Sequence, residues 1–241
     1  MNDQRVAENL LFDRLSTSGR QRLLGDDQPV NLDFSQTLSE PGDRMRHVYF
    51  PTDGFISLIA PGVGRKQLEV GLVGNEGMLG VQLLLGVDVS PLRAMVQGSG
   101  HAWRVKTSVL LKELAQNPGL KEALHRYLYV FLAQLMQAAT CTRFHLVEAR
   151  LARWLLMTRD RAHSPHFRIT HEFLALMLGV RRVGVTRAAS ALQLRKLIKY
   201  SRGNISILDR RGLERAACPC YAIDNQIYAL NIKGPRKTLE Q

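Results

Sequence analysis

The stretch from Thr170 to Leu197 constrains the fold of this chain more than any other part of the sequence. It predicts two short helices joined by a tight turn. Thr170 is a favourable N-cap, and Glu172 lies in the first turn, where the helix dipole favours a carboxylate. The apolar face of this first helix is formed by Leu174, Ala175 and Leu178. Gly179 then supplies the left-handed conformation that ends a helix before a sharp turn.

The second helix begins near Arg181 and has two distinct faces. One face is apolar and is expected to pack on the first helix: Val185, Ala188, Ala189 and Leu192. The other side chains near its start are Arg181, Arg182, Val183, Thr186 and Arg187. This spacing is typical of a helix-turn-helix, whose second helix enters the DNA major groove. Arginine there suits bidentate contact with guanine. The alternative is an ordinary pair of packed helices with a solvated cationic face.

Charge favours the nucleic-acid interpretation. Residues 146–241 contain 18 Lys and Arg against 7 Asp and Glu, so they carry +11 of the chain's net charge of +12. A basic domain joined to a nearly neutral one is typical of a DNA-binding protein, because phosphate neutralisation supplies most non-specific affinity. An anionic membrane surface would attract the same charge, but no apolar run approaches the roughly 18 residues of a spanning helix. We therefore expect double-stranded DNA, and no membrane, as the partner.

The cysteines and the N-terminus indicate a cytoplasmic protein. Met1 to Leu15 contains three carboxylates and lacks the apolar core of a signal peptide. Cys141, Cys218 and Cys220 are an odd number and form no disulfide framework. A Cys-x-Cys pair with one distant cysteine is a weak metal signal, so we expect no metal site. Inert or partly buried thiols are favoured, with a redox role left open.

The rest of the sequence predicts an α+β fold in three parts. Residues 1–116 are expected to form an antiparallel β-roll with flanking short helices, because short apolar runs there are broken by frequent glycines. A long helix over 117–145 follows. Residues 146–241 form the helix-turn-helix domain, completed by a small hairpin over 200–208, a wing whose Arg202 is expected to reach phosphates.

The long helix has two apolar stripes. One is a heptad seam that consists of Leu124, Leu128, Phe131, Leu135, Ala138, Thr142 and His145. The other consists of Tyr127, Val130, Leu132, Met136 and Ala139. We expect the second stripe to face the β-roll and the seam to face the same helix of a second subunit. The alternative is a single central helix buried within one monomer.

This order of parts resembles the Crp/Fnr superfamily of bacterial transcription regulators over nearly the whole chain. The supporting segments are Val48 to Pro51, Gly54 to Ser57, Val73 to Gly80, Asn117-Pro118, Phe144 with Arg150 to Ala152, and the helix-turn-helix. The resemblance implies a homodimeric regulator on an inverted-repeat operator, with RNA polymerase as a further partner. It also implies that Arg182, Val183 and Arg187 read bases. We place His171, at the start of the first helix, with these DNA contacts.

The sensor half departs from the relatives that bind cyclic nucleotides. They hold the ribose with a glycine-glutamate pair and the phosphate with an arginine followed by serine or threonine. The matching positions here are Gly80-Val81 and Leu92-Arg93, so the ribose carboxylate is missing. We do not expect cyclic AMP as the effector, and the sequence names no other. No cysteine cluster lies near the N-terminus to hold the iron-sulfur cluster of the oxygen-sensing branch.

No grouping of serine, histidine and carboxylate indicates a catalytic site, so we expect a regulator without enzymatic activity. Two other interpretations stay open. The chain could be a small-molecule-binding module whose helix-turn-helix contacts a protein, or the roll could bind no ligand at all. Selective binding of one DNA sequence would separate the regulator from the first of these.

Overall fold

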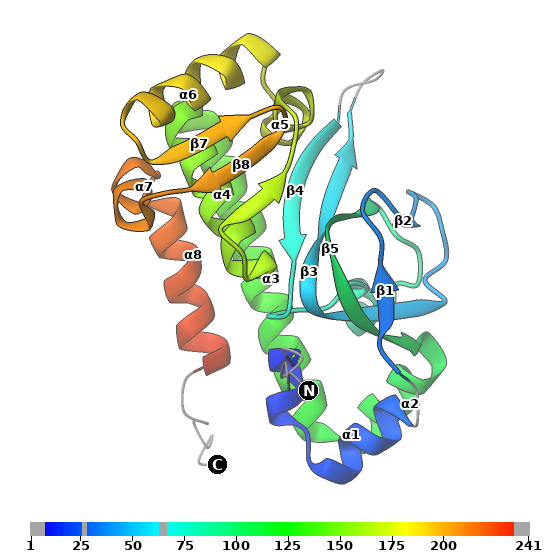
Figure 1. Ribbon diagram of the computed structural model, residues 1–241. Coiled ribbons are helices and arrows are strands. Elements are labelled where there is room, and N and C mark those ends of the chain that lie inside the picture. Colours follow the sequence, from blue (N-terminus) through cyan, green and yellow to red (C-terminus); the bar gives the residue numbers. More distant parts are fainter. Residues whose placement is uncertain (1–7, 26–27, 63–66, 234–241) are drawn as a thin grey trace, which may run out of the picture.

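The computed structural model describes residues 8–25, 28–62 and 67–233. The fold is α+β, as the sequence predicts, with an N-terminal antiparallel sheet, a long central helix and a C-terminal winged helix-turn-helix unit (Figure 1). None of the helices in these ranges combines the length and the hydropathy needed to span a bilayer.

The N-terminal half is a curled antiparallel sheet. Two short helical segments precede it, η1 (Leu10–Arg14) and α1 (Thr17–Leu24). Its strands are β1 (Val30–Leu32), β2 (Thr37–Ser39), β3 (His47–Pro61), β4 (Gln67–Val73) and β5 (Arg93–Lys106). They pair in the order β1-β5-β3-β4, and β2 also pairs with β5. The turn helix η2 (Val81–Leu85) and helix α2 (Thr107–Gln116) complete this half.

Helix α3 (Pro118–Phe144) packs across this half and contributes to its core. Asn117 caps it by accepting a hydrogen bond from the backbone N–H of Leu120. Leu124 and Phe131 are buried in the same cluster as the sheet side chains. These two seam residues therefore belong to the core of one protomer, and the expectation that they face a second subunit is wrong.

The apolar residues on the exposed face of α3 are not those of the heptad seam. Tyr129, Leu132 and Met136 keep 56%, 47% and 63% of their surface accessible. Tyr127 and Val130, which we expected on the same stripe as Leu132 and Met136, are buried. The orientation of α3 differs from the expected one, because the face that is buried against the sheet includes residues of both predicted stripes.

The C-terminal half contains the helix-turn-helix and a small sheet. In chain order it consists of α4 (Val147–Ala162), β6 (His166–Arg168), α5 (His171–Leu178), α6 (Arg182–Leu194), β7 (Ile198–Ser201), β8 (Asn204–Ile207) and α7 (Arg210–Ala216). The three strands pair in the order β6-β8-β7. Strand β6 lies between α4 and α5 and pairs with β8, so the small sheet has three strands rather than the two of the expected hairpin.

The last described elements return to the N-terminal half. Helix α8 (Cys220–Tyr228) and the π-helical turn η3 (Ala229–Lys233) pack against α3, and α8 runs beside it in Figure 1. Tyr228 and Ile232 are buried in the core that the sheet and α3 share. These residues therefore pack outside the DNA-binding domain to which we assigned the whole of 146–241.

Candidate nucleic-acid interface

The turn between α5 and α6 is built by local hydrogen bonds. Thr170 Oγ1 accepts from the backbone N–H of Phe173, 3.2 Å away, and so caps α5. Gly179 ends α5 with φ +61°, in the left-handed region that glycine adopts without strain. A Cβ atom at this position would lie 2.8 Å from Leu68 Cδ1 on β4. Gly179 therefore allows both the turn and the close approach of this unit to the sheet.

Helix α6 buries one face and exposes the other. Its buried side chains, Val185, Ala188, Ala189 and Leu192, join the core of the C-terminal half. The five residues expected to contact DNA at its start are all exposed: Arg181, Arg182, Val183, Thr186 and Arg187. Arg181 is the N-cap residue and α6 begins at Arg182. The first turns of the helix thus present cationic side chains to solvent.

His171 contacts other residues of the same unit. Its Nδ1 lies 3.0 Å from Thr186 Oγ1, and its ring stacks on Tyr200 with centroids 4.4 Å apart. Desolvation and the nearby Arg182 lower the pKa of His171, which favours the neutral ring. The half-buried ring joins α5 and β7 to α6. This arrangement suits a residue that positions the recognition helix.

The wing places another cation beside the same surface. Arg202 and Gly203 form the tight turn between β7 and β8, both with positive φ, and Arg202 is exposed. Tyr200 Oη donates to the carbonyl of Ile169, 3.0 Å away, which fixes the strand to the segment before α5. Arg168 on β6 is exposed too and was missed by sequence reasoning, because β6 was not expected.

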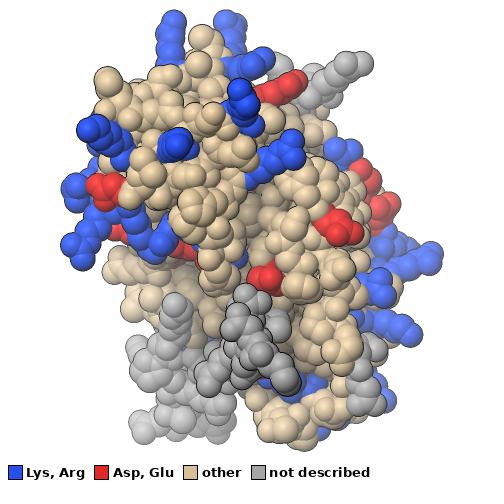
Figure 2. Space-filling model, in the orientation of Figure 1, with Lys and Arg blue, Asp and Glu red and all other residues tan. Residues whose placement is uncertain are grey.

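These arginines have no carboxylate partner among the described residues. Over the residues that the structure describes, no ion pair involves Arg181, Arg182, Arg187 or Arg202. Figure 2 shows Lys and Arg side chains projecting from the end of the molecule where α6 lies. An exposed cationic helix face beside a cationic wing is chemically suited to a phosphate backbone.

Two polar contacts join α4 of the helix-turn-helix half to the N-terminal half. Trp154 Nε1 on α4 donates to Glu69 Oε1 on β4 at 2.7 Å, and Ser57 donates to the other carboxylate oxygen. Burial raises the pKa of Glu69 to about 7. Arg161 on α4 pairs with Glu76 at 2.8 Å, and both side chains are largely buried. The placement of the helix-turn-helix therefore depends on groups in the N-terminal half.

The expected effector positions do not form an open phosphate site. Arg93 makes a bidentate pair with Glu40, with nitrogen-oxygen distances of 2.8 and 2.9 Å. Val81 is buried, and a Cβ atom at Gly80 would lie 2.7 Å from Val48 Cγ1. The Leu92 carbonyl accepts from Ser90 Oγ. The one cation among the four positions is thus already occupied by a carboxylate.

The three cysteines lie together, although their sequence spacing is a weak metal signal. Cys141 near the end of α3 meets Cys218 and Cys220 from the segment that leads into α8, and His145 joins them. The signal in the sequence was the spacing of Cys141 and His145, which puts both on one side of a helical turn. Cys218 and Cys220 are far from Cys141 in the sequence, so their place in the cluster could not be predicted.

Comparison with known proteins agrees with this geometry. Residues 149–216 match the model of the Crp-like helix-turn-helix domain. The structure is similar to that of FixK2 from Bradyrhizobium japonicum, with 15% identity, a TM-score of 0.67 and coverage of 79% of this chain and 97% of that one. No curated protein matches the sequence significantly.

Two regulators from Thermus thermophilus give the same result. A transcriptional regulator of the CRP family, TTHB099, shares 17% identity with a TM-score of 0.65, over 78% of this chain and 96% of that one. TTHA1359, of the CRP/FNR family, shares 25% identity with a TM-score of 0.55, over 79% and 98%. The chain thus spans almost the full length of both regulators.

Proposed function

Because the chain belongs to the Crp/Fnr superfamily of transcription regulators, we propose that it binds a specific DNA sequence as a homodimer and so regulates transcription. The observation that carries the proposal is the face of α6 that bears Arg182, Val183 and Arg187. These side chains are exposed, whereas the opposite face of the helix is fixed in the core. Such a helix can enter a major groove without losing its own packing.

The role of each side chain follows from its chemistry. Arg182 and Arg187 present guanidinium groups that can donate two hydrogen bonds to guanine O6 and N7. Val183 has no polar side-chain atom, so it can contact only an apolar group such as a thymine methyl. Arg202 in the wing is suited to phosphate, which carries no sequence information.

Dimerisation is proposed through the exposed row of α3. Tyr129, Leu132 and Met136 form an exposed apolar strip on one face of α3, and the opposite face of the helix is buried in the core. A second copy related by a two-fold axis would cover it with the same strip. The two recognition helices would then meet successive major grooves about 34 Å apart, which requires an inverted-repeat operator.

The signal that the sensor half receives is proposed to differ from cyclic AMP. Val81 stands where a ribose-binding carboxylate is needed, and Arg93 is engaged by Glu40. A phosphate would have to displace that carboxylate to reach the guanidinium. RNA polymerase remains a proposed partner of the DNA-bound dimer.

The test is selection of bound sequences from random duplex DNA by the purified full chain. We expect enrichment of an inverted repeat with half-sites one helical turn apart. Arg187→Ala should cost roughly 1 to 3 kcal/mol on the selected site and relax the preference at one base pair. Arg202→Ala, the matched arginine in the wing, should weaken selected and random DNA alike. Equal losses on both kinds of DNA for Arg187→Ala would contradict its base-reading role, and no enriched motif would favour a protein-contact role for the helix-turn-helix.

A further inference from the structure

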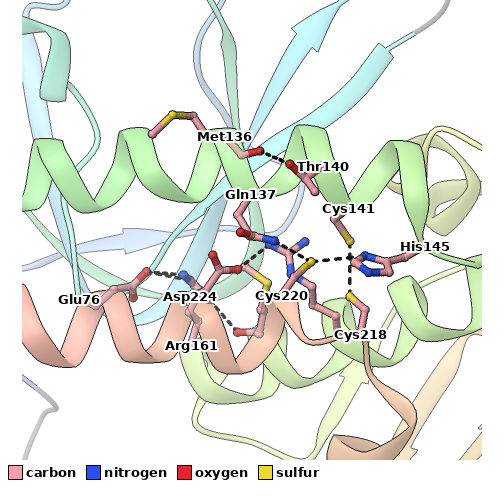
Figure 3. Close-up of polar contacts among 12 residues, drawn as sticks. Glu76, Met136, Gln137, Thr140, Cys141, His145, Arg161, Cys218, Cys220 and Asp224 are labelled. Atoms are coloured by element: carbon pink, nitrogen blue, oxygen red, sulfur yellow. Dashed lines mark hydrogen bonds and ion pairs between the residues drawn. The ribbon is translucent and has the colours of Figure 1, made fainter.

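Three thiols and one imidazole converge where α3 ends (Figure 3). Cys141 is in the last turn of α3 and His145 is the residue that caps its C-terminus. Cys218 lies in the segment between α7 and α8, and Cys220 is the first residue of α8. All three cysteines of the chain are in this one place, and all three are buried.

The distances fit a single small metal ion. Cys141 Sγ lies 3.5 Å from Cys218 Sγ, and Cys220 Sγ lies 3.4 Å from His145 Nδ1. The four ligand atoms all lie within 4.8 Å of one another. In a tetrahedral zinc site, Zn–S bonds of about 2.3 Å hold the sulfur atoms about 3.8 Å apart. Ligands that bind different iron atoms of an iron-sulfur cluster would stand farther apart.

We propose that Cys141, His145, Cys218 and Cys220 bind one Zn²⁺ ion. Thiolate and imidazole ligands in tetrahedral arrangement select zinc among the common divalent ions. All four positions come from the protein and the sulfur atoms are buried, which is typical of a structural site rather than a catalytic one with an open position. Binding displaces the thiol protons to solvent, and no electron transfer is involved.

The surroundings supply the groups that a zinc-thiolate centre needs. Gln137 Nε2 donates to Cys220 Sγ at 3.0 Å, a contact that stabilises a metal-bound thiolate. Arg150 and Arg153 lie close enough to Cys141 and Cys218 for electrostatic attraction to their thiolates. Three thiolates and a neutral imidazole around Zn²⁺ leave one net negative charge. Arg153 also pairs with Asp224 at 2.6 Å, so the two guanidinium groups balance two negative charges, one on Asp224 and one on the zinc centre.

The position of the ion gives it a mechanical role. It joins the end of α3 to the segment between α7 and α8, and α4 begins at Val147, two residues after His145. Zn²⁺ would therefore fix how the C-terminal half leaves the long helix. The effect of the ion on DNA affinity rests on the proposed function, whereas metal binding itself does not.

The experiment uses the full chain, stripped with a chelator under reducing conditions and titrated with Co²⁺ and then Zn²⁺. We expect one equivalent of Co²⁺ to give thiolate-to-metal charge transfer and the visible bands of a tetrahedral site, which one equivalent of Zn²⁺ removes. His145→Ala and Cys218→Ser should each weaken binding more than about 100-fold, since even groups that only support a ligand cost 10- to 100-fold. His125→Ala changes an exposed histidine on the same helix and should leave binding unchanged.

His145→Cys is the control for loss of metal binding that is caused only by misfolding. It should still bind Co²⁺, with the stronger charge transfer of four thiolates. Absence of a tetrahedral Co²⁺ spectrum in the native sequence, or equal binding by Cys218→Ser, would overturn the proposal, as would a Cys141–Cys218 disulfide in protein that takes up no metal. Loss of DNA binding with an intact Co²⁺ spectrum would count against the proposed function alone.

Discussion

At the scale of single residues, the proposed contact of Val183 with a base can be tested by one substitution. It lies between Arg182 and Arg187 on the exposed face of α6, with 55% of its surface accessible. Val183→Glu would place a carboxylate there that accepts a hydrogen bond from cytosine N4. We expect selection with this variant to move the preference at one base pair towards cytosine.

The control for that prediction is Ser190→Glu, an exposed position further along α6. It adds the same charge and should weaken all sequences without changing the motif. An unchanged motif with Val183→Glu would show that residue 183 does not read a base.

Glu69 predicts a dependence of stability on pH. Its pKa is raised from 4.5 to about 7 because burial penalises the charged form. The native state therefore holds this proton more tightly than the unfolded chain does. Its contribution is complete below pH 4.5 and is lost as the pH rises through 7.

Glu69→Gln should remove this dependence. The loss of unfolding free energy between pH 5 and pH 8 should be about 1 to 3 kcal/mol smaller in the variant than in the native sequence. Urea unfolding at both pH values measures it. Glu122→Gln, which changes an exposed carboxylate on α3, should behave like the native sequence. Identical pH profiles for Glu69→Gln and the native chain would contradict the raised pKa.

At the scale of elements, α3 tests the proposed dimer. Leu132→Glu and Met136→Glu should each convert a dimer into a monomer, because a second copy would have to bury the new charge. Analytical ultracentrifugation gives the answer directly. Leu111→Glu changes a comparably exposed leucine on α2 and should leave the dimer intact. Dimers that persist in both α3 variants would place the interface elsewhere.

Some helices and strands could be predicted from the sequence and others could not. The α5–α6 turn was predictable because Thr170, Gly179 and the apolar spacing are local signals, and the structure confirms them. The orientation of α3 could not be predicted. The helix has two apolar stripes, and only tertiary packing decides which residues of them contact the sheet and which are left for a partner. Strand β6 was missed since His166–Arg168 becomes a strand only by pairing with β8.

The candidate sites divide in the same way. The cationic face of α6 follows from helical periodicity, so its residues could be named from the sequence. The cluster of Cys141, His145 and the two later cysteines depends on α8 returning to α3. Helix α8 is held beside α3 because Tyr228 and Ile232 are buried in the core of the N-terminal half. These contacts are between residues far apart in the sequence, and no local sequence pattern predicts them.

At the scale of the whole molecule, the contact between Arg161 and Glu76 joins the helix-turn-helix half to the N-terminal half. The pair is nearly enclosed, with side chains 9% and 14% exposed, and the Glu76 carbonyl also accepts a hydrogen bond from Tyr228 Oη. Glu76→Gln leaves a buried guanidinium without its carboxylate, which costs about 3 kcal/mol. Asp88→Asn breaks the exposed Arg44–Asp88 pair instead and should cost no more than about 0.5 kcal/mol.

The same variant tests whether the two halves unfold together. In a Trp103→Phe background, Trp154 on α4 is the only tryptophan left, so fluorescence follows the C-terminal half while far-ultraviolet circular dichroism follows the whole chain. We expect the two urea transitions to coincide when Glu76 is present and to separate in Glu76→Gln, because α4 then loses the buried ion pair that joins it to the N-terminal half. Coincident transitions in Glu76→Gln, with a loss no larger than that of Asp88→Asn, would mean that α8 and the Glu69–Trp154 contact are sufficient to transmit structure between the halves.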